Sequence, residues 1–280
     1  MNVIKNTNMQ INMKKLNYQI KNPFYLVSNS PWPFLVAMAL IPFILLIVDI
    51  LHNIQTCAYD KILRTTLFFL PIYYWFYDLI VEGTFLGLHT TRVQKGLTIG
   101  FILFLLSEVM FFFAIFWSFF YFSVSPSVWI GNIWPPKGIN PIDPWGIALL
   151  NTIILVSSGF FANYAHILLI SGDRNRSLYM LLVTIALGVL FTAFQLYEYN
   201  SAEFSINDSV FGSIFFFSTG FHGLHVLIGT LFLIFSFLRH LFYHFMREHH
   251  LGLKFAIWYW HFVDVIWIFL YLFVYIWGGK

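Results

Sequence analysis

An acidic side chain lies inside one of the most apolar stretches of the chain. Glu108 belongs to FLLSEVMFFFAIFW, residues 104–117, where Ser107 is the only other polar residue. An ionised acid at the centre of a membrane helix costs about 2.5–3.5 kcal/mol on insertion scales, so such a residue is a candidate functional site. We expect the acid to be neutral, because the bilayer removes the solvation of a carboxylate. Two interpretations stay open: a hydrogen bond to a neighbouring helix, through Ser107 or a facing histidine, or a role in proton handling.

Two histidines lie one helical turn apart in the glycine-rich segment STGFHGLHVLIG. His222 and His225 are three residues apart, so they share one face of a helix. Two imidazoles so placed could bind a metal ion, but protein metal sites use three or four ligands. The glycines around them allow membrane helices to approach closely. We therefore favour hydrogen bonds to neighbouring helices over a metal site.

The segment WYWHFVDVIWIF repeats this arrangement with an acid in place of the second histidine. His261 and Asp264 are also three residues apart and can meet on one helix face. An aspartate that orients an imidazole could belong to a metal site or to a proton relay. We favour a polar pair that anchors this helix to its neighbours, since the segment offers no third partner.

The segment RHLFYHFMREHH contains the largest group of histidines, namely His240, His244, His249 and His250. Their spacing resembles the histidine boxes of membrane di-iron oxygenases, which is one alternative function for the chain. Those enzymes need several boxes with HxxHH elements, and this chain has none. Basic residues in and beside the segment favour contact with anionic lipid headgroups instead. They are Arg239, Arg247 and Lys254.

The composition is that of an integral membrane protein. Hydrophobic residues make up 59% of the 280 residues and charged residues only 10%, against about 45–50% and about 25% in soluble domains. The net charge of +3 gives no indication of nucleic-acid binding. A single cysteine, Cys57, excludes a disulfide framework within the chain. No phosphate-binding loop, dinucleotide fingerprint, nucleophile elbow or HExxH zinc motif is present.

Seven apolar stretches approach the ~20 residues that cross a bilayer as a helix. They lack the alternation of a barrel strand, so the predicted fold class is an all-α integral membrane protein with seven transmembrane helices. The second stretch is the weakest, because its uncharged part between Arg64 and Asp78 is short and contains Pro71. The predicted spans are 33–51, 61–80, 97–122, 146–170, 177–198, 209–238 and 255–277.

The distribution of basic residues predicts the orientation. With seven spans and the N-terminus inside, eleven Lys and Arg residues lie in inner segments and four in outer ones, as the positive-inside rule requires. The connection 123–146 holds five prolines and three glycines, so we expect it to be irregular and to lie outside. The predicted organisation is an inner tail at 1–32, two helices at 33–80, an inner connection at 81–96 and a five-helix bundle at 97–280.

These segments resemble subunit III of cytochrome c oxidase, the third core subunit of the haem–copper terminal oxidase. The matching motifs follow the order of that family and leave only about the first 30 residues uncovered. They are SPWP (30–33), GTFLGLHT (83–90), VQKG (93–96), SEVMFFFAIFW (107–117), WPP (134–136), LLNT (149–152), SGDR (171–174), FHGLHVLIG (221–229) and WYWHFVDVIW (258–267).

The resemblance implies two-helix and five-helix bundles flanking a lipid-filled V-shaped cleft, in the mitochondrial inner membrane with the N-terminus in the matrix and the C-terminus in the intermembrane space. It implies that haem a, haem a3 and copper belong to partner subunits and that this chain has no cofactor of its own. Expected partners are subunit I directly, the other oxidase subunits, phospholipids, and, through the complex, cytochrome c and respiratory supercomplexes. The implied role is to support proton uptake and stability of subunit I, with lipids that line a path for oxygen.

Residue roles follow from the resemblance position by position. Glu108 falls on the intramembrane carboxylate of the family. Three departures occur near the second span, where Leu88, Val81 and Tyr77 replace residues that are often His, Arg and a basic residue in the family, which puts headgroup contacts there in doubt. The lipid-contact positions are Glu82, Phe85, His89, Trp117, Arg239 and His244.

Two further alternatives remain beside the di-iron oxygenase. Subunit III of a bacterial quinol oxidase resembles the same motifs but usually lacks the first two helices, which SPWP and GTFLGLHT supply here. A transporter would need a pair of broken helices, and the sequence offers none.

Overall fold

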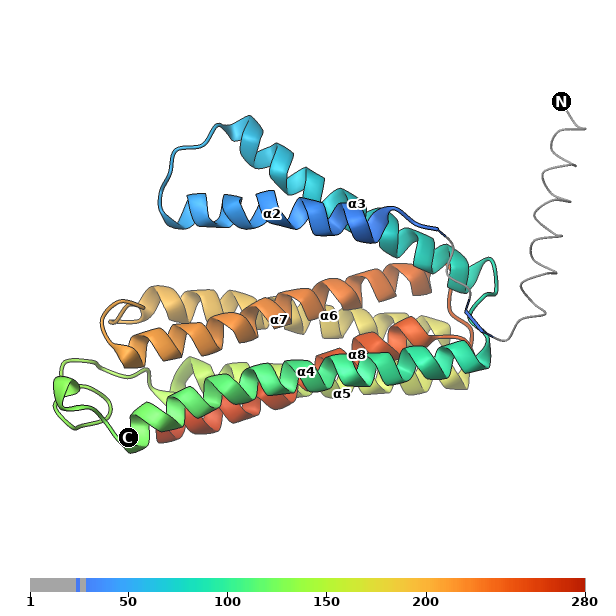
Figure 1. Ribbon diagram of the computed structural model, residues 1–280. Helices are drawn as coiled ribbons and strands as arrows, with labels where there is room; N and C mark the ends of the chain where they lie inside the picture. Colours follow the sequence, from blue (N-terminus) through green and yellow to red (C-terminus); the bar gives the residue numbers. More distant parts are fainter. Residues whose placement is uncertain (1–23, 26–28, 280) are drawn as a thin grey trace, which may run out of the picture. The chain divides into compact units, whose positions relative to one another are not determined.

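Seven long helices make up most of the computed structural model, which describes residues 24–25 and 29–279 (Figure 1). Most of the predicted tail at 1–32 lies outside the described residues. No strand occurs in the described part of the chain, so the all-α class is confirmed. The helices are α2 (Trp32–Leu51), α3 (Ala58–Thr84), α4 (Thr91–Val124), α5 (Leu149–Ser171), α6 (Arg174–Ser201), α7 (Val210–Leu241) and α8 (Leu251–Leu270).

Six of these helices are long and apolar enough to cross a membrane, and α3 is the exception. The α3 segment is also the weakest of the seven spans predicted from the sequence. The helix itself is continuous through Pro71 over 27 residues, which is about 40 Å at about 1.5 Å per residue. Charged residues at both ends, among them Asp60 and Glu82, account for its lower apolarity. That α3 spans the bilayer stays a prediction.

The predicted inner connection at 81–96 is mostly helical. α3 continues to Thr84 and α4 begins at Thr91, which leaves only residues 85–90 between them. The polar start of α4, TRVQKG, contains arginine, glutamine and lysine, whose unbranched side chains lose little freedom in a helix. Helix propensity therefore extends α4 beyond its apolar part, and a search for apolar stretches misses such an end.

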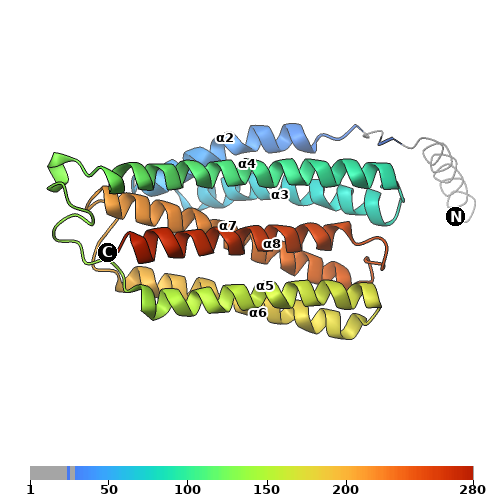
Figure 2. The same cartoon turned by 90° about the horizontal axis from the view of Figure 1, so that it is seen from below.

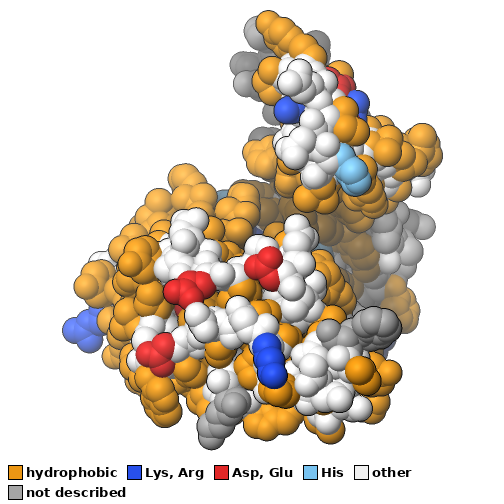
Figure 3. Space-filling model, turned by 90° about the vertical axis from the view of Figure 1, so that its left-hand side faces the viewer, with side chains coloured by type: hydrophobic (Ala, Val, Ile, Leu, Met, Phe, Trp, Pro, Cys, Tyr) orange, Lys and Arg blue, Asp and Glu red, His pale blue; other side chains and the backbone are white. Residues whose placement is uncertain are grey.

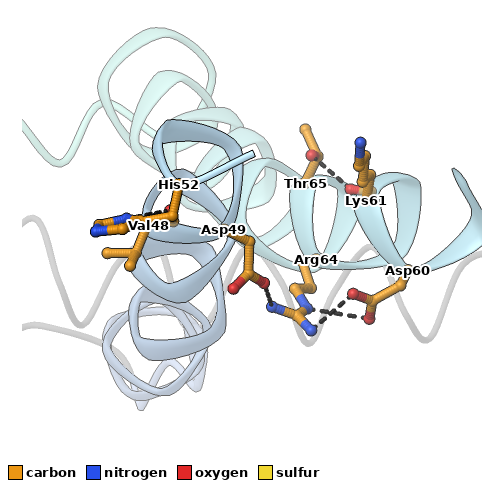
Figure 4. Close-up of polar contacts among 7 residues, drawn as sticks. All are labelled: Val48, Asp49, His52, Asp60, Lys61, Arg64 and Thr65. Atoms are coloured by element: carbon orange, nitrogen blue, oxygen red, sulfur yellow. Dashed lines mark hydrogen bonds and ion pairs between the residues drawn. The ribbon is translucent and has the colours of Figure 1, made fainter. Parts of the chain in front are cut away.

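The chain divides into two compact units, Met1–Ile99 and Gly100–Lys280. In the first, α2 and α3 are joined by an ion cluster next to their connecting loop (Figure 4). Arg64 Nη1 lies 3.0 Å from Asp49 Oδ2 on α2, and Arg64 Nη2 lies 2.6 Å from Asp60 Oδ2 on its own helix. Arg64 thus pairs with two acids, one on each helix. Ion pairing lets a guanidinium lie close to apolar helices.

In the second unit, α5, α6, α7 and α8 form a closed ring in which each helix contacts two others, and α4 packs outside it (Figures 1 and 2). α4 contacts this ring through aromatic pairs such as Phe101 with Phe255 and Phe116 with Phe269. A short turn of π-helix, η3 (Tyr271–Trp277), continues α8. The core contains the fully buried rings of Trp260 and Trp267.

The turn between α5 and α6 shows how sequence sets a helix boundary. Gly172 has a φ of 91°, the left-handed conformation that glycine adopts without strain, and it ends α5. The next residue, Asp173, accepts a hydrogen bond from the backbone N–H of Arg176 and so caps the start of α6. The SGDR motif is therefore a tight reversal that makes α5 and α6 antiparallel neighbours.

The predicted irregular connection at 123–146 contains only a short 3₁₀ turn, η1 (Val128–Ile130), and the start of the π-helical turn η2 (Pro144–Ala148). Figure 3 shows charged and other polar side chains at one end of the second unit, while its flanks are hydrophobic. Exposed charged residues in the connections of this unit include Lys137, Asp143, Glu203 and Asp208. Apolar flanks with polar ends suit a bundle that spans a bilayer.

Candidate functional site

The intramembrane acid Glu108 faces a histidine of another helix. Its Oε2 atom lies 2.9 Å from Nε2 of His225, so the contact joins α4 to α7. The Glu108 side chain is 25% exposed and that of His225 is 10% exposed. Ser107, the other partner considered for the acid, donates to the Phe104 carbonyl of its own helix at 2.7 Å. The structure thus brings together two of the sequence candidates, which lie 117 residues apart in the chain.

The other nitrogen of His225 determines which tautomer faces the acid. Nδ1 lies 2.7 Å from the backbone carbonyl oxygen of Phe221. A carbonyl oxygen only accepts hydrogen bonds, so Nδ1 carries a hydrogen. One further proton then lies between Nε2 and Glu108 Oε2. Either a neutral acid donates to a neutral imidazole, or an imidazolium donates to a carboxylate, and the pair has zero net charge in both forms.

Aromatic rings pack against the imidazole of this pair. The Tyr259 ring of α8 stacks on His225 with 6.3 Å between centroids, and the Phe112 ring of α4 meets the imidazole edge-on at 5.0 Å. Phe262 of α8 also contacts the imidazole. Nothing in the sequence connected Tyr259 with Glu108, because the two residues are distant in the chain.

His222, one turn from His225, does not join the pair. Its ring is buried between Phe191 and Trp267, with centroid distances of 5.8 and 5.1 Å. Within the described residues neither of its ring nitrogens has a hydrogen-bond partner. The prediction that His222 hydrogen-bonds to a neighbouring helix therefore finds no partner in the described part of the chain.

His261 and Asp264 lie together on α8, with 3.6 Å between Nδ1 and Oδ2. The His261 side chain is 43% exposed and that of Asp264 is 9% exposed. Asp264 packs against α5 at Gly159, where an added Cβ atom would lie 2.1 Å from Oδ2. The aspartate thus occupies the space that the absence of a side chain at Gly159 provides.

The histidines of the 240–250 segment do not converge on one point. His250 Nε2 lies 3.0 Å from Nε2 of His166 on α5, a residue that the sequence did not single out. His240 is buried at the end of α7. No group of three or more His, Cys, Asp or Glu side chains is arranged to hold a metal ion among the residues that the structure describes.

Three predicted lipid-contact residues belong to the first unit. Glu82 accepts a hydrogen bond from the Tyr25 hydroxyl, and the ring of His89 meets that of Tyr25 edge-on at 5.9 Å. Burial, together with the hydrogen bond to Glu82, raises the pKa of Tyr25 to about 12. Phe85 is exposed. Tyr25 therefore connects Glu82 with His89, a contact that the sequence did not suggest.

The other three lie in the second unit. Trp117 is exposed on α4. The guanidinium of Arg239 lies over the Phe245 ring at 4.6 Å, and burial and the charge of Arg239 lower the pKa of His244 below its usual value. Nearby, Arg174 donates to the Leu241 carbonyl at 2.7 Å and so satisfies the C-terminus of α7.

The structure buries a second acid that the sequence did not predict. Glu198 on α6 is 1% exposed, and its Oε1 accepts a hydrogen bond of 2.6 Å from the Tyr275 hydroxyl. The segment QLYEYNSAE around it contains many polar residues, so Glu198 resembled an ordinary residue at the end of a helix. One sequence signal was available: Gln195 lies three residues earlier, so the amide and the acid share one face of the helix.

Comparison with known proteins gives one consistent result. A family model described as Cytochrome c oxidase subunit III matches residues 22–279. The chain is 50% identical over 268 residues to "Cytochrome c oxidase subunit 3" of Emericella nidulans and 47% identical over 268 residues to the protein of that name from Podospora anserina. Each alignment covers 96% of this chain and 99% of the relative. The Arabidopsis thaliana protein of the same name is 48% identical over 92% of this chain and 98% of its own length.

Proposed function

The chain belongs to the cytochrome c oxidase subunit III family, and from this membership we propose that it is a non-redox subunit that binds phospholipid and supports proton uptake and stability of subunit I. The oxidase is an oxidoreductase complex. In this proposal electrons from cytochrome c reach oxygen through haem a, haem a3 and copper in the partner subunits. This chain supplies no redox centre, packs directly on subunit I and takes part in respiratory supercomplexes as a component of the complex.

We place the chain in the mitochondrial inner membrane with its N-terminus in the matrix. The matrix side then holds the short connections after α3, α5 and α7 and the C-terminus faces the intermembrane space. The excess of Lys and Arg in the matrix segments supports this orientation. The polar connections at 123–146 and 202–209 then lie on the intermembrane side.

The contact between Glu108 and His225 is the observation that supports a role in proton handling. The pair has zero net charge wherever its shared proton lies, so its presence inside the bilayer avoids the cost of an isolated charge. Moving that proton from Oε2 to Nε2 requires no rearrangement of heavy atoms at a separation of 2.9 Å. The partly exposed carboxyl can also exchange its proton with groups outside the bundle. Such a pair suits a proton donor and acceptor beside the uptake path of subunit I.

We expect Glu108→Gln to slow proton uptake without preventing assembly. The glutamine amide can still donate to His225 Nε2, but it has no proton to transfer. The slowing should not exceed about tenfold, or about 1.4 kcal/mol in the barrier, because subunit I retains its own proton-conducting groups. The measurement is stopped-flow proton uptake by the intact oxidase with a pH-indicating dye.

Glu203→Gln is the matched control, since Glu203 is exposed and bonds to Asn140 at 2.7 Å. Uptake in this variant should equal that of the wild type. A normally assembled Glu108→Gln oxidase with wild-type uptake would contradict proton handling and leave only an interhelical hydrogen bond.

Lipid binding rests on the basic residues at the matrix end of α7. Arg239 and His244 lie within interaction range of each other, and the Arg239 guanidinium covers the Phe245 ring. We expect Arg239→Gln to weaken retention of anionic phospholipid about fivefold, because one basic residue near the headgroups contributes about 1 kcal/mol. Native mass spectrometry of the purified oxidase would measure the lipids retained.

Arg239→Lys keeps the charge and should retain most of the lipid. Arg176→Gln is a second control, because Arg176 is exposed and pairs with Asp173 at 3.3 Å. Equal lipid content in the Gln and Lys variants of Arg239 would count against an electrostatic headgroup contact.

A further inference from the structure

Glu198 is an acid enclosed entirely by one bundle. Its side chain is 1% exposed and receives two hydrogen bonds at Oε1, from the Tyr275 hydroxyl at 2.6 Å and from Gln195 Nε2 at 3.4 Å. Within the described part of the chain, Oε2 has no partner. No Lys, Arg or His in that part forms a hydrogen bond or an ion pair with this carboxyl.

The polar side chains that interact with the acid are neutral. Gln195 and Tyr199 belong to α6, and Tyr199 donates to Thr219 of α7 at 2.8 Å. Tyr275 comes from η3, the turn that continues α8. A carboxylate in such a place would lack the cation that buried charges require, and two neutral donors replace only part of its solvation.

The two polar atoms without partners give an independent indication of the protonation state. They are Glu198 Oε2 and Gln195 Oε1, which belong to residues one helical turn apart. With an ionised acid both atoms are acceptors, so neither can satisfy the other. A proton on Oε2 makes that atom a donor and allows a bond to Gln195 Oε1. Because Gln195 Nε2 already faces Oε1 of the acid, a cyclic acid–amide pair with two hydrogen bonds would satisfy both atoms.

We propose that Glu198 is a second proton-binding site of this chain, a carboxylic acid that stays protonated and fastens the C-terminal turn η3 to α6 through Gln195 and Tyr275. The site differs in kind from Glu108. Glu108 faces an imidazole that can accept its proton and is partly exposed, whereas Glu198 is buried and bonds only to neutral groups in the described part of the chain. Glu198 therefore keeps its proton during turnover, and its role is to hold the bundle together.

Infrared spectroscopy of the intact oxidase tests this directly. We expect the carbonyl stretching band of a protonated acid to disappear in Glu198→Gln and to remain in the control Glu203→Gln, whose acid is exposed. In the wild type this band should persist from mildly acidic to mildly alkaline pH and should shift slowly in D₂O. Loss of a carboxylate band in Glu198→Gln, with the acid band unchanged, would overturn the proposal.

A second variant keeps the test decisive if Glu198→Gln does not assemble. Tyr275→Phe retains the acid but removes its shorter hydrogen bond, so the same band should move to higher frequency. The wild-type titration needs no variant at all. Disappearance of every buried acid band on raising the pH to mildly alkaline values would show that Glu198 ionises and would refute a permanent proton.

Discussion

Replacing Gly159 with valine is expected to remove the chain from the assembled oxidase. An added Cβ atom would lie 2.1 Å from Asp264 Oδ2 and 3.4 Å from His261 Nδ1. Asp264 has a short side chain that is 9% exposed, so it cannot move aside easily. α8 cannot retreat either, because Trp260 Nε1 bonds to Ser158 Oγ of α5 at 2.8 Å. The close approach of α5 and α8 at a glycine is typical of membrane helices.

The expected loss of stability is about 3 kcal/mol, the upper end for overpacking, because the contact is shorter than any that real structures tolerate. The amount of the chain in purified oxidase and its dissociation temperature measure the effect. Gly220→Ala and Gly223→Ala are matched controls on α7, where an added Cβ meets no atom within 4 Å. Their effects should stay below about 1 kcal/mol, the range of an exposed helix substitution. A Gly159→Val chain that assembles with wild-type stability would contradict this packing.

Replacing Trp260 with alanine should destabilise the second unit by about 3–5 kcal/mol. Its fully buried ring contacts three helices. It lies against Gly188 of α6, where an added Cβ would be 2.7 Å from Cη2, and against Gly229 of α7, at 3.0 Å from Cε3. Its Nε1 donates to Ser158 of α5. Truncation therefore leaves a cavity at the centre of the ring of helices, and thermal dissociation of the complex would measure the cost.

Comparing Trp260→Phe with Trp260→Ala separates the contribution of the N–H group from that of the ring. Trp260→Phe loses the hydrogen bond but fills most of the space, so we expect a loss of about 1 kcal/mol from the bond and a smaller additional loss from packing. Trp145→Ala is the control for loss of an indole, because Trp145 is 70% exposed. Equal losses for Trp260→Ala and Trp145→Ala would show that the central ring does not support the bundle.

The helices could be predicted because lipid leaves the backbone almost no choice. A long apolar run inside a bilayer must satisfy its own N–H and C=O groups, so its length alone indicates a helix. Helix ends were less predictable, as the segment 81–96 illustrates, because polar residues with good helix propensity continue a helix beyond its apolar part. The turn at Gly172 was different, since a glycine followed by a capping aspartate defines a boundary locally.

Charged residues near the bilayer were only partly predictable. The sequence showed that Arg64 lay at the edge of a weak span but not that Asp49 of the preceding helix would face it (Figure 4). The lipid-filled cleft and the lipid-contact roles of Glu82, Phe85, His89, Trp117, Arg239 and His244 stay predictions.

The sequence by itself determined that Glu108 is an acid deep in a membrane helix, because hydrophobicity and helical rise are local properties of a segment. It also determined the family, because the motifs keep their order along the chain. Only the tertiary structure decided that His225 faces this acid, that the Phe221 carbonyl fixes the imidazole tautomer, and that Glu198 is buried beside Tyr275. These contacts depend on how each helix is rotated about its axis. That rotation is set by packing between residues far apart in the chain, such as Trp260 against two glycines and Asp264 against a third.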